Sequence, residues 1–186
     1  IKVDLRLNDR VVDLVEEGID VAFRMGDLPD SNLIARKLCS SPIVTVASPE
    51  YLKRNGTPQH PSDLRDHNYI VYSDTGRREE TAFQEGGKPL YVRVDGNLST
   101  NNTEAMRTAL ISGLGISRGP RWLIGDAIAG GELVEILPDY QPGAMGIHVV
   151  YSSGRHLPSK VRCFIEFFMD QFKHCSLICG CADEGL

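Results

Sequence analysis

The sequence has 186 residues, of which 41% are hydrophobic and 24% charged, and its formal net charge is −5. A chain of this length and composition can bury a core as one domain or as two small lobes. The acidic balance lacks the basic field of a nucleic-acid-binding surface, and no apolar run approaches the roughly 20 residues that span a bilayer.

The first half of the chain alternates strand and helix signals. Residues 1–7 alternate apolar and polar side chains, which predicts a strand with one buried face. Asn8 or Asp9 is expected to cap the following helix, which Gly18 ends. Further strands are predicted at residues 19–23, 33–38 and 42–47.

Four residues that follow or separate these strands are candidate site residues. Residues 19–23, IDVAF, form an apolar run typical of a buried parallel strand, with Arg24 and Met25 at its carboxyl end. Ser40 and Ser41 lie between the next two predicted strands.

The second half continues the alternation. Ser48 and Pro49 predict the start of a short helix that Gly56 closes. Strands are predicted at residues 69–72, 83–86, 90–94, 133–137 and 147–151, and helices at residues 120–129 and from Pro158 onward.

The stretch 98–118, LSTNNTEAMRTALISGLGISR, predicts a strand end, a polar loop, a helix, a glycine turn and another strand. Ser99, Thr100, Asn101 and Asn102 are candidate caps of that helix. A helix that begins at the carboxyl end of a strand presents free N–H groups and a partial positive charge. A small carboxylate is therefore a candidate ligand for this position.

The sequence contains no G-x-G-x-x-G, no P-loop and no G-x-S-x-G motif. His148 lies in the predicted strand IHVVY, where we expect a hydrogen-bonded structural histidine. No enzyme activity and no cofactor are predicted.

The five cysteines are an odd number, which argues against a disulfide framework and favours a reducing compartment, so we expect a cytoplasmic protein. Cys175, Cys179 and Cys181 lie beside His174, but their spacing matches no common zinc motif, and no metal site is predicted. Residues 176–186 are expected to be disordered.

Several of these stretches resemble the effector-binding domain of LysR-type transcriptional regulators, over about residues 1–172. The segments that carry the resemblance are VDLVEEGIDVAFRMGDLPDSNLIARKL (12–38), SSPIVTVASPEYLKRNGTPQHPSDLRDHNYIVY (40–72), GLGISRGPRWLIGDAIAGGELVEILPDY (113–140) and SSGRHLPSKVRCFIEFF (152–168).

The resemblance implies an α/β fold of two Rossmann-like lobes, like a type 2 periplasmic binding protein, joined by crossover strands near residues 45–48 and 147–151. Lobe I then comprises residues 1–46 and 148–175, and lobe II residues 47–147. The family's first strand and helix would precede Ile1, so lobe I is expected to lack them.

The family binds small effectors in the interlobe cleft, often carboxylates, and works as a homodimer or homotetramer. Promoter DNA is contacted through an N-terminal winged helix-turn-helix that this sequence does not contain. The resemblance places Arg24 as the charge partner and the helix start at Asn101 and Asn102 as the anion cradle. The full set of implied effector positions is Asn8, Asp9, Arg24, Met25, Ser40, Ser41, Ser73, Asp74, Thr100, Asn101, Asn102 and Pro120.

Two other classes of function are weighed against a regulator. A stand-alone solute-binding protein of a transporter would need export, and the lone cysteines and the LysR-like segments argue against it. An enzyme on this fold, such as a lyase or deaminase acting on a small carboxylate, would need a poised acid–base pair, and the sequence indicates none.

Overall fold

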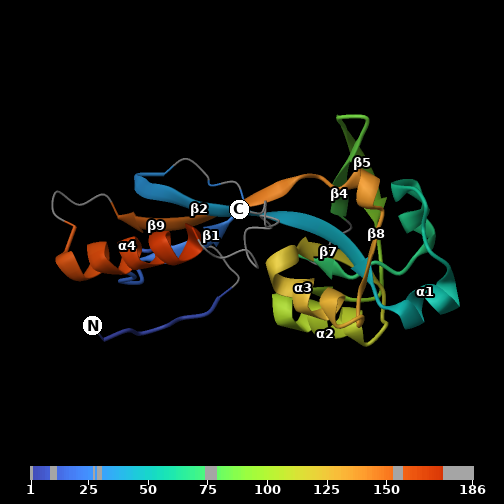
Figure 1. The fold of residues 1–186 in the computed structure, drawn as a ribbon, viewed down its shortest axis with the longest axis horizontal. Helices are drawn as coiled ribbons and strands as arrows, with labels where there is room; N and C mark the ends of the chain where they lie inside the picture. Colours follow the sequence, from blue (N-terminus) through green and yellow to red (C-terminus); the bar gives the residue numbers. More distant parts are fainter. Residues whose placement is uncertain are drawn as a thin grey trace, which may run out of the picture. The chain divides into compact units, whose positions relative to one another are not determined.

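A computed structural model describes residues 2–8, 12–26, 28, 31–73, 79–152 and 157–173. Two compact units are present (Figure 1): unit 1 comprises Ile1–Pro42 and Ala144–Leu186, and unit 2 comprises Ile43–Gly143. These limits fall four residues before the lobe limits expected from the sequence. Asp9, Asp74 and the cysteine-rich tail lie outside the described residues.

Unit 1 is a small antiparallel sheet with one long helix. The central strand β9 (Ala144–Ser152) pairs with β1 (Ala22–Met25) on one side and with the first part of β2 (Leu33–Ala47) on the other. Helix α4 (Ser159–Lys173) covers one face, where its Val161 and Ile165 pack against Val149 and Tyr151 of β9.

Unit 2 is built around the last part of β2, which pairs antiparallel with β7 (Ile116–Pro120) and β8 (Val134–Ile136). Strands β3 (Val71–Tyr72) and β6 (Ser99–Thr100) pair in parallel, and β4 (Glu79–Glu85) and β5 (Lys88–Val94) form a hairpin. The helices are α1 (Pro49–Asn55), α2 (Thr103–Ile111), α3 (Arg121–Ala129) and two short 3₁₀ turns, η1 (Pro61–Asp66) and η2 (Pro138–Tyr140).

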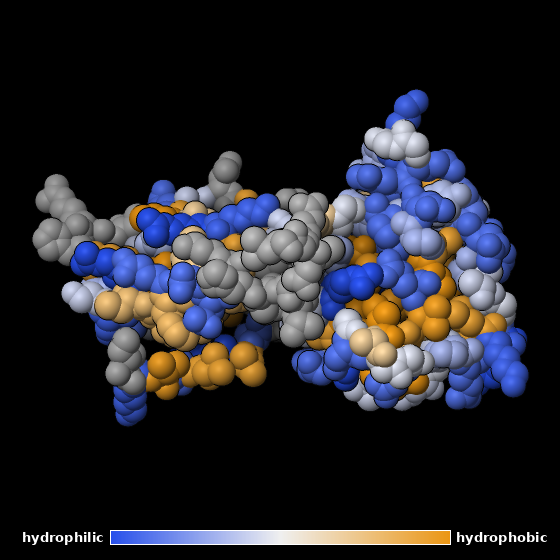
Figure 2. All heavy atoms as spheres, in the orientation of Figure 1, coloured by the Kyte–Doolittle hydropathy of each residue, from blue (hydrophilic) through white to orange (hydrophobic). Residues whose placement is uncertain are grey.

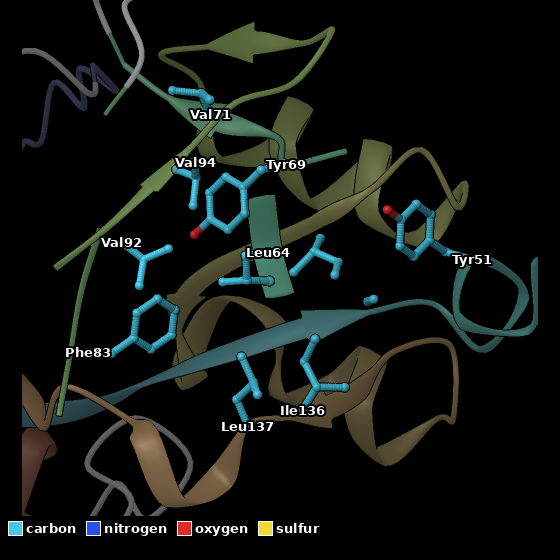
Figure 3. Packing of buried hydrophobic residues seen from close by; sticks show 11 residues of the cluster. Tyr51, Leu64, Tyr69, Val71, Phe83, Val92, Val94, Ile136 and Leu137 are labelled. Carbon is cyan, nitrogen blue, oxygen red and sulfur yellow. The ribbon is translucent and has the colours of Figure 1, made fainter. Parts of the chain in front are cut away.

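Two apolar clusters fill unit 2. In the first, the Tyr69 and Phe83 rings lie beside Leu64 and the two valines of β5, Val92 and Val94 (Figure 3). The second fills the space between the strands and helices α2 and α3. Its buried members are Val44, Val46, Ile70, Met106, Ala109, Leu110, Leu123, Ile124, Ala127 and Leu133.

Local sequence signals explain several element ends. Ser48 caps α1, because its Oγ accepts a hydrogen bond from Tyr51 N at 3.2 Å, and Pro49 occupies the first helical position. Gly56 ends α1 with φ of 83°, a left-handed value that glycine adopts without strain. The predictions for α1, α2 and the last helix are confirmed.

The predicted first strand is wrong for residues 2–8, which are extended but join no strand. Val3, Leu5 and Leu7 are 60%, 74% and 87% exposed. Alternation predicts a strand only where a neighbouring strand supplies hydrogen bonds and an apolar face, and no described strand lies beside this segment.

The helix expected after Asn8 or Asp9 is a single turn over residues 14–18 in the described part of this segment. Its cap is Asp13, whose Oδ1 accepts hydrogen bonds from Val15 N at 2.8 Å and Glu16 N at 3.1 Å. Gly18 ends the turn with φ of 63°, as predicted, while Ile19 N donates to Leu14 O at 2.8 Å.

The prediction of a buried parallel strand at 19–23 is also wrong. Strand β1 starts at Ala22, is antiparallel to β9 and includes Arg24 and Met25 rather than ending before them. Its exposure alternates, with Phe23 and Met25 the more exposed residues, because α4 covers their side of the strand only in part.

Strand β2 runs without a break through the predicted gap between residues 38 and 42, so Ser40 and Ser41 lie within a strand. Pro42 does not break the strand, because it lies where β2 changes its partner. The residues up to Pro42 pair with β9, and those from Ile43 onward pair with β7. A proline lacks the N–H of a ladder residue and is tolerated where pairing changes.

Candidate functional site

Three strand ends of unit 2 gather at one edge. Tyr72 of β3 pairs in parallel with Thr100 of β6, and Ser73 N donates to Thr100 O at 2.9 Å. A parallel bridge between Tyr69 and Ile116 places the start of β7 on the other side of β3. Parallel strands end at the same edge, so Ser73, the residues after Thr100, and Pro120 share it.

Helix α2 begins at this edge and is capped by Asn102. The Oδ1 atom of Asn102 accepts a hydrogen bond from Ala105 N at 2.9 Å, and Asn102 N donates to Thr100 Oγ1 at 3.1 Å. Asn101 is half-buried, and its side chain makes no hydrogen bond to a described residue. An amide with unused hydrogen-bonding capacity therefore lies next to a helix N-terminus.

Helix α3 begins at the same edge without a side-chain cap, since Pro120 occupies its N-cap position. Its first turn contains no acidic residue. The first N–H groups of a helix need partners from outside the helix. Pro120 is one of the effector positions that the family resemblance implies, and it is the uncapped start of α3.

Charged side chains brace these two helices. Arg107 of α2 donates to Asp126 of α3 at 2.6 Å, and this hydrogen bond holds the pKa of the Asp126 carboxyl below its usual value. Arg121 of α3 pairs with Glu135 of β8. Glu104 lies in the first turn of α2.

In unit 1, Arg24 is half-buried and its Nη2 donates to Val12 O at 2.6 Å. One of the five guanidinium N–H groups is thereby used. Arg24 pairs across the ladder with His148, and Ser40 pairs with Gly146. Because residues 146 and 148 share one side of β9, Arg24, Ser40 and His148 lie on the sheet face opposite to α4.

His148 differs from the expected hydrogen-bonded structural histidine. Its Nδ1 is buried and accepts or donates no hydrogen bond among the described residues. The ring lies against Gly146, where an added Cβ would come within 2.5 Å of the ring atom Cε1. The period-two pattern of GIHVVY was the signal that placed His148 on this face.

The other predicted positions of unit 1 are dispersed. Ser41 is buried and pairs with Met145, which puts it on the α4 side of the sheet. Met25 is exposed and pairs with Ile147, and Asn8 is exposed in the extended N-terminal segment. Among the described residues no group of acidic, histidine or cysteine side chains is arranged to hold a metal ion.

Comparison with known proteins identifies the family. Residues 1–173 match the LysR substrate binding domain. The chain is 36% identical over 159 residues to an uncharacterized HTH-type transcriptional regulator of Haemophilus influenzae, covering 86% of this chain and 55% of that protein. It is also 36% identical over 183 residues to the HTH-type transcriptional regulator DmlR of Escherichia coli, covering 92% and 56%.

Solved structures agree. Full-length AphB, the Vibrio cholerae virulence activator, matches with a TM-score of 0.78 and 29% identity over 92% of this chain and 58% of that chain. The regulatory domain of CrgA from Neisseria meningitidis matches with a TM-score of 0.75 and 29% identity over 85% and 78%.

The chain belongs to the LysR-type transcriptional regulators and forms their regulatory, effector-binding domain, which has the type 2 periplasmic-binding-protein-like fold. It spans a little over half the length of the curated relatives that it matches. Those relatives are transcriptional regulators rather than enzymes. No described helix has the length and apolarity that a membrane crossing requires.

Proposed function

We propose that this domain senses a small carboxylate that binds at the edge of unit 2 formed by Ser73, residues 100–102 and Pro120. The observation that carries the proposal is the pair of helix starts at that edge, one with an unused amide beside it and the other without a side-chain cap. Together they offer N–H donors and partial positive charge to an anion.

In unit 1 we propose that the face bearing Arg24, Ser40 and His148 also takes part in effector sensing. On this face Arg24 offers a positive charge and His148 offers a ring nitrogen without a described partner. In this proposal the domain acts in the cytoplasm within a homodimeric or homotetrameric regulator that contacts promoter DNA through a winged helix-turn-helix.

The proposal is tested first by native mass spectrometry of the purified chain, which identifies a co-purifying effector. Binding of that effector is then compared between Asn102→Ser and Asn102→Asp. Both variants keep a side chain that caps α2, but the aspartate adds a negative charge where the carboxylate binds. We expect Asn102→Asp to weaken binding at least about tenfold and Asn102→Ser to weaken it less than about threefold.

Thr57→Asp is the matched control, because it adds the same charge at an exposed position elsewhere in unit 2. If Thr57→Asp weakens binding as much as Asn102→Asp, the anion does not bind at this edge. For unit 1, Arg24→Gln should weaken binding more than Arg24→Lys, which keeps the charge. Equal affinity in all three Arg24 forms would remove Arg24 from the site.

A further inference from the structure

Unit 1 contains a groove that lies apart from the proposed effector positions. It has a volume of about 200 Å³ and is lined by Arg36 of β2, Tyr151 of β9, and Leu157, Arg162, Ile165 and Glu166 in and before α4. The side chain of Arg36 lies on the α4 face, because Arg36 pairs with Val149, whose side chain packs against α4. The groove therefore runs between the β2 edge of the sheet and α4.

Tyr151 contributes a hydroxyl group to the lining of this groove. Tyr151 is only 5% exposed and lines the groove, yet its hydroxyl makes no hydrogen bond to a described residue. The hydroxyl oxygen itself faces the open groove, since the described buried polar atoms without a partner are Trp122 Nε1 and His148 Nδ1. A ligand oxygen in the groove would supply a partner for the hydroxyl.

The charges around the groove favour an anion. Neither guanidinium, of Arg36 or of Arg162, forms an ion pair with a described residue, although Glu166 also lines the groove. Two cations and one anion leave a net charge of +1. A planar guanidinium matches the two oxygens of a carboxylate, and Tyr151 can donate a third hydrogen bond.

We propose that this groove is a second ligand site that binds a monocarboxylate with a short apolar tail. Leu157 and Ile165 provide the apolar contact for the tail, while Arg36, Arg162 and Tyr151 hold the carboxylate. A volume of about 200 Å³ suits a small aliphatic acid. The site uses no residue of the effector edge in unit 2.

The test uses the 186-residue chain and isovalerate as the probe, with isovaleramide as the neutral compound of the same shape. Methyl chemical shifts of Leu157 and Ile165 are followed by NMR during titration. We expect saturable shifts with a Kd on the order of 1 mM, and at least about tenfold weaker binding of the amide, because charge-assisted hydrogen bonds are the stronger ones.

Three substitutions assign the contacts. Arg36→Gln, Arg162→Gln and Tyr151→Phe should each weaken isovalerate binding about fivefold or more. Tyr151→Phe keeps the ring that packs against α4, so an unchanged melting temperature would show that the fold is intact. Arg93→Gln is the matched control, since Arg93 is an exposed arginine of a strand in unit 2, and it should leave the affinity unchanged.

Shifts that grow linearly without saturation would overturn the proposal, and so would equal binding of isovalerate and its amide. An unchanged affinity in Tyr151→Phe would also overturn it. Binding that persists in Asn102→Asp separates this groove from the effector edge. If the tests contradict one site, the other site can therefore still be tested with its own variants.

Discussion

The two units of this domain bury very different amounts of apolar surface. Among the described residues, the clusters of unit 2 contain eleven and ten buried residues, whereas the cluster of unit 1 contains four. Unit 1 also exposes Val3, Leu5 and Leu7, and Figure 2 shows hydrophobic spheres at the surface near the N-terminal segment. Since apolar burial is the main stabilising contribution, we expect unit 2 to be the more stable unit.

The aromatic residues of unit 1 contact one another but are only partly buried. Phe23 of β1 contacts Phe164, Phe168 and Phe172 of α4, with ring centroids 5.0 to 6.5 Å apart. Phe23 itself remains 40% exposed. These contacts attach α4 to the sheet from one side, without the enclosure that Phe83 has in unit 2. Two unfolding transitions are therefore expected, with unit 1 unfolding first.

The largest expected effect comes from truncating Phe83, which is fully buried in unit 2. Phe83→Ala should lower the free energy of unfolding of unit 2 by about 4 kcal/mol, because it removes buried area and leaves a cavity. Phe164→Ala in unit 1 should cost about 1–2 kcal/mol, since that ring is only partly covered. Urea denaturation followed by circular dichroism measures both, and equal losses would contradict the difference between the units.

The buried Tyr69 makes the stability of unit 2 depend on pH, which offers a second way to compare the two units. Burial raises the pKa of its hydroxyl above the ordinary 10.0, despite opposing contributions from Arg118, Thr81 and Ser117. The neutral hydroxyl therefore stabilises the fold fully below pH 10, and this stability is lost as the pH rises through the folded pKa. Thermal denaturation should show unit 2 losing stability above pH 10, with a shallower loss in Tyr69→Phe. Identical pH profiles would show that another group is responsible.

The smallest expected effect concerns the exposed N-terminal segment. Leu5→Ala should change the free energy of unfolding of unit 1 by less than about 0.5 kcal/mol, because the side chain is already in solvent. Leu14→Ala, at a buried position of the same unit, should cost about 2 kcal/mol or more. A cost above 1 kcal/mol for Leu5→Ala would place Leu5 in a packed contact.

Sequence signals predicted elements whose causes are local. Ser48 and Pro49 fixed the start of α1, Asn102 fixed that of α2, and the apolar spacing of residues 161–172 indicated α4. Each of these signals lies within one or two helical turns, and each is confirmed.

Features that depend on distant partners were not predictable in the same way. The continuity of β2 through Pro42 depends on which strand lies beside each half, and the antiparallel direction of β1 depends on β9. For the candidate site, Ser73, Thr100 and Pro120 were expected from the family resemblance, whereas the place of His148 required the register of β9 against β1 and β2.

The chain contains a single tryptophan, Trp122. It is the second residue of α3, half-buried against the second apolar cluster of unit 2 and next to the helix start that no side chain caps. Its fluorescence is therefore a built-in optical probe of this edge. Without any label, its emission should report when a ligand occupies the α3 N-terminus, whereas a ligand in the groove of unit 1 should leave it unchanged.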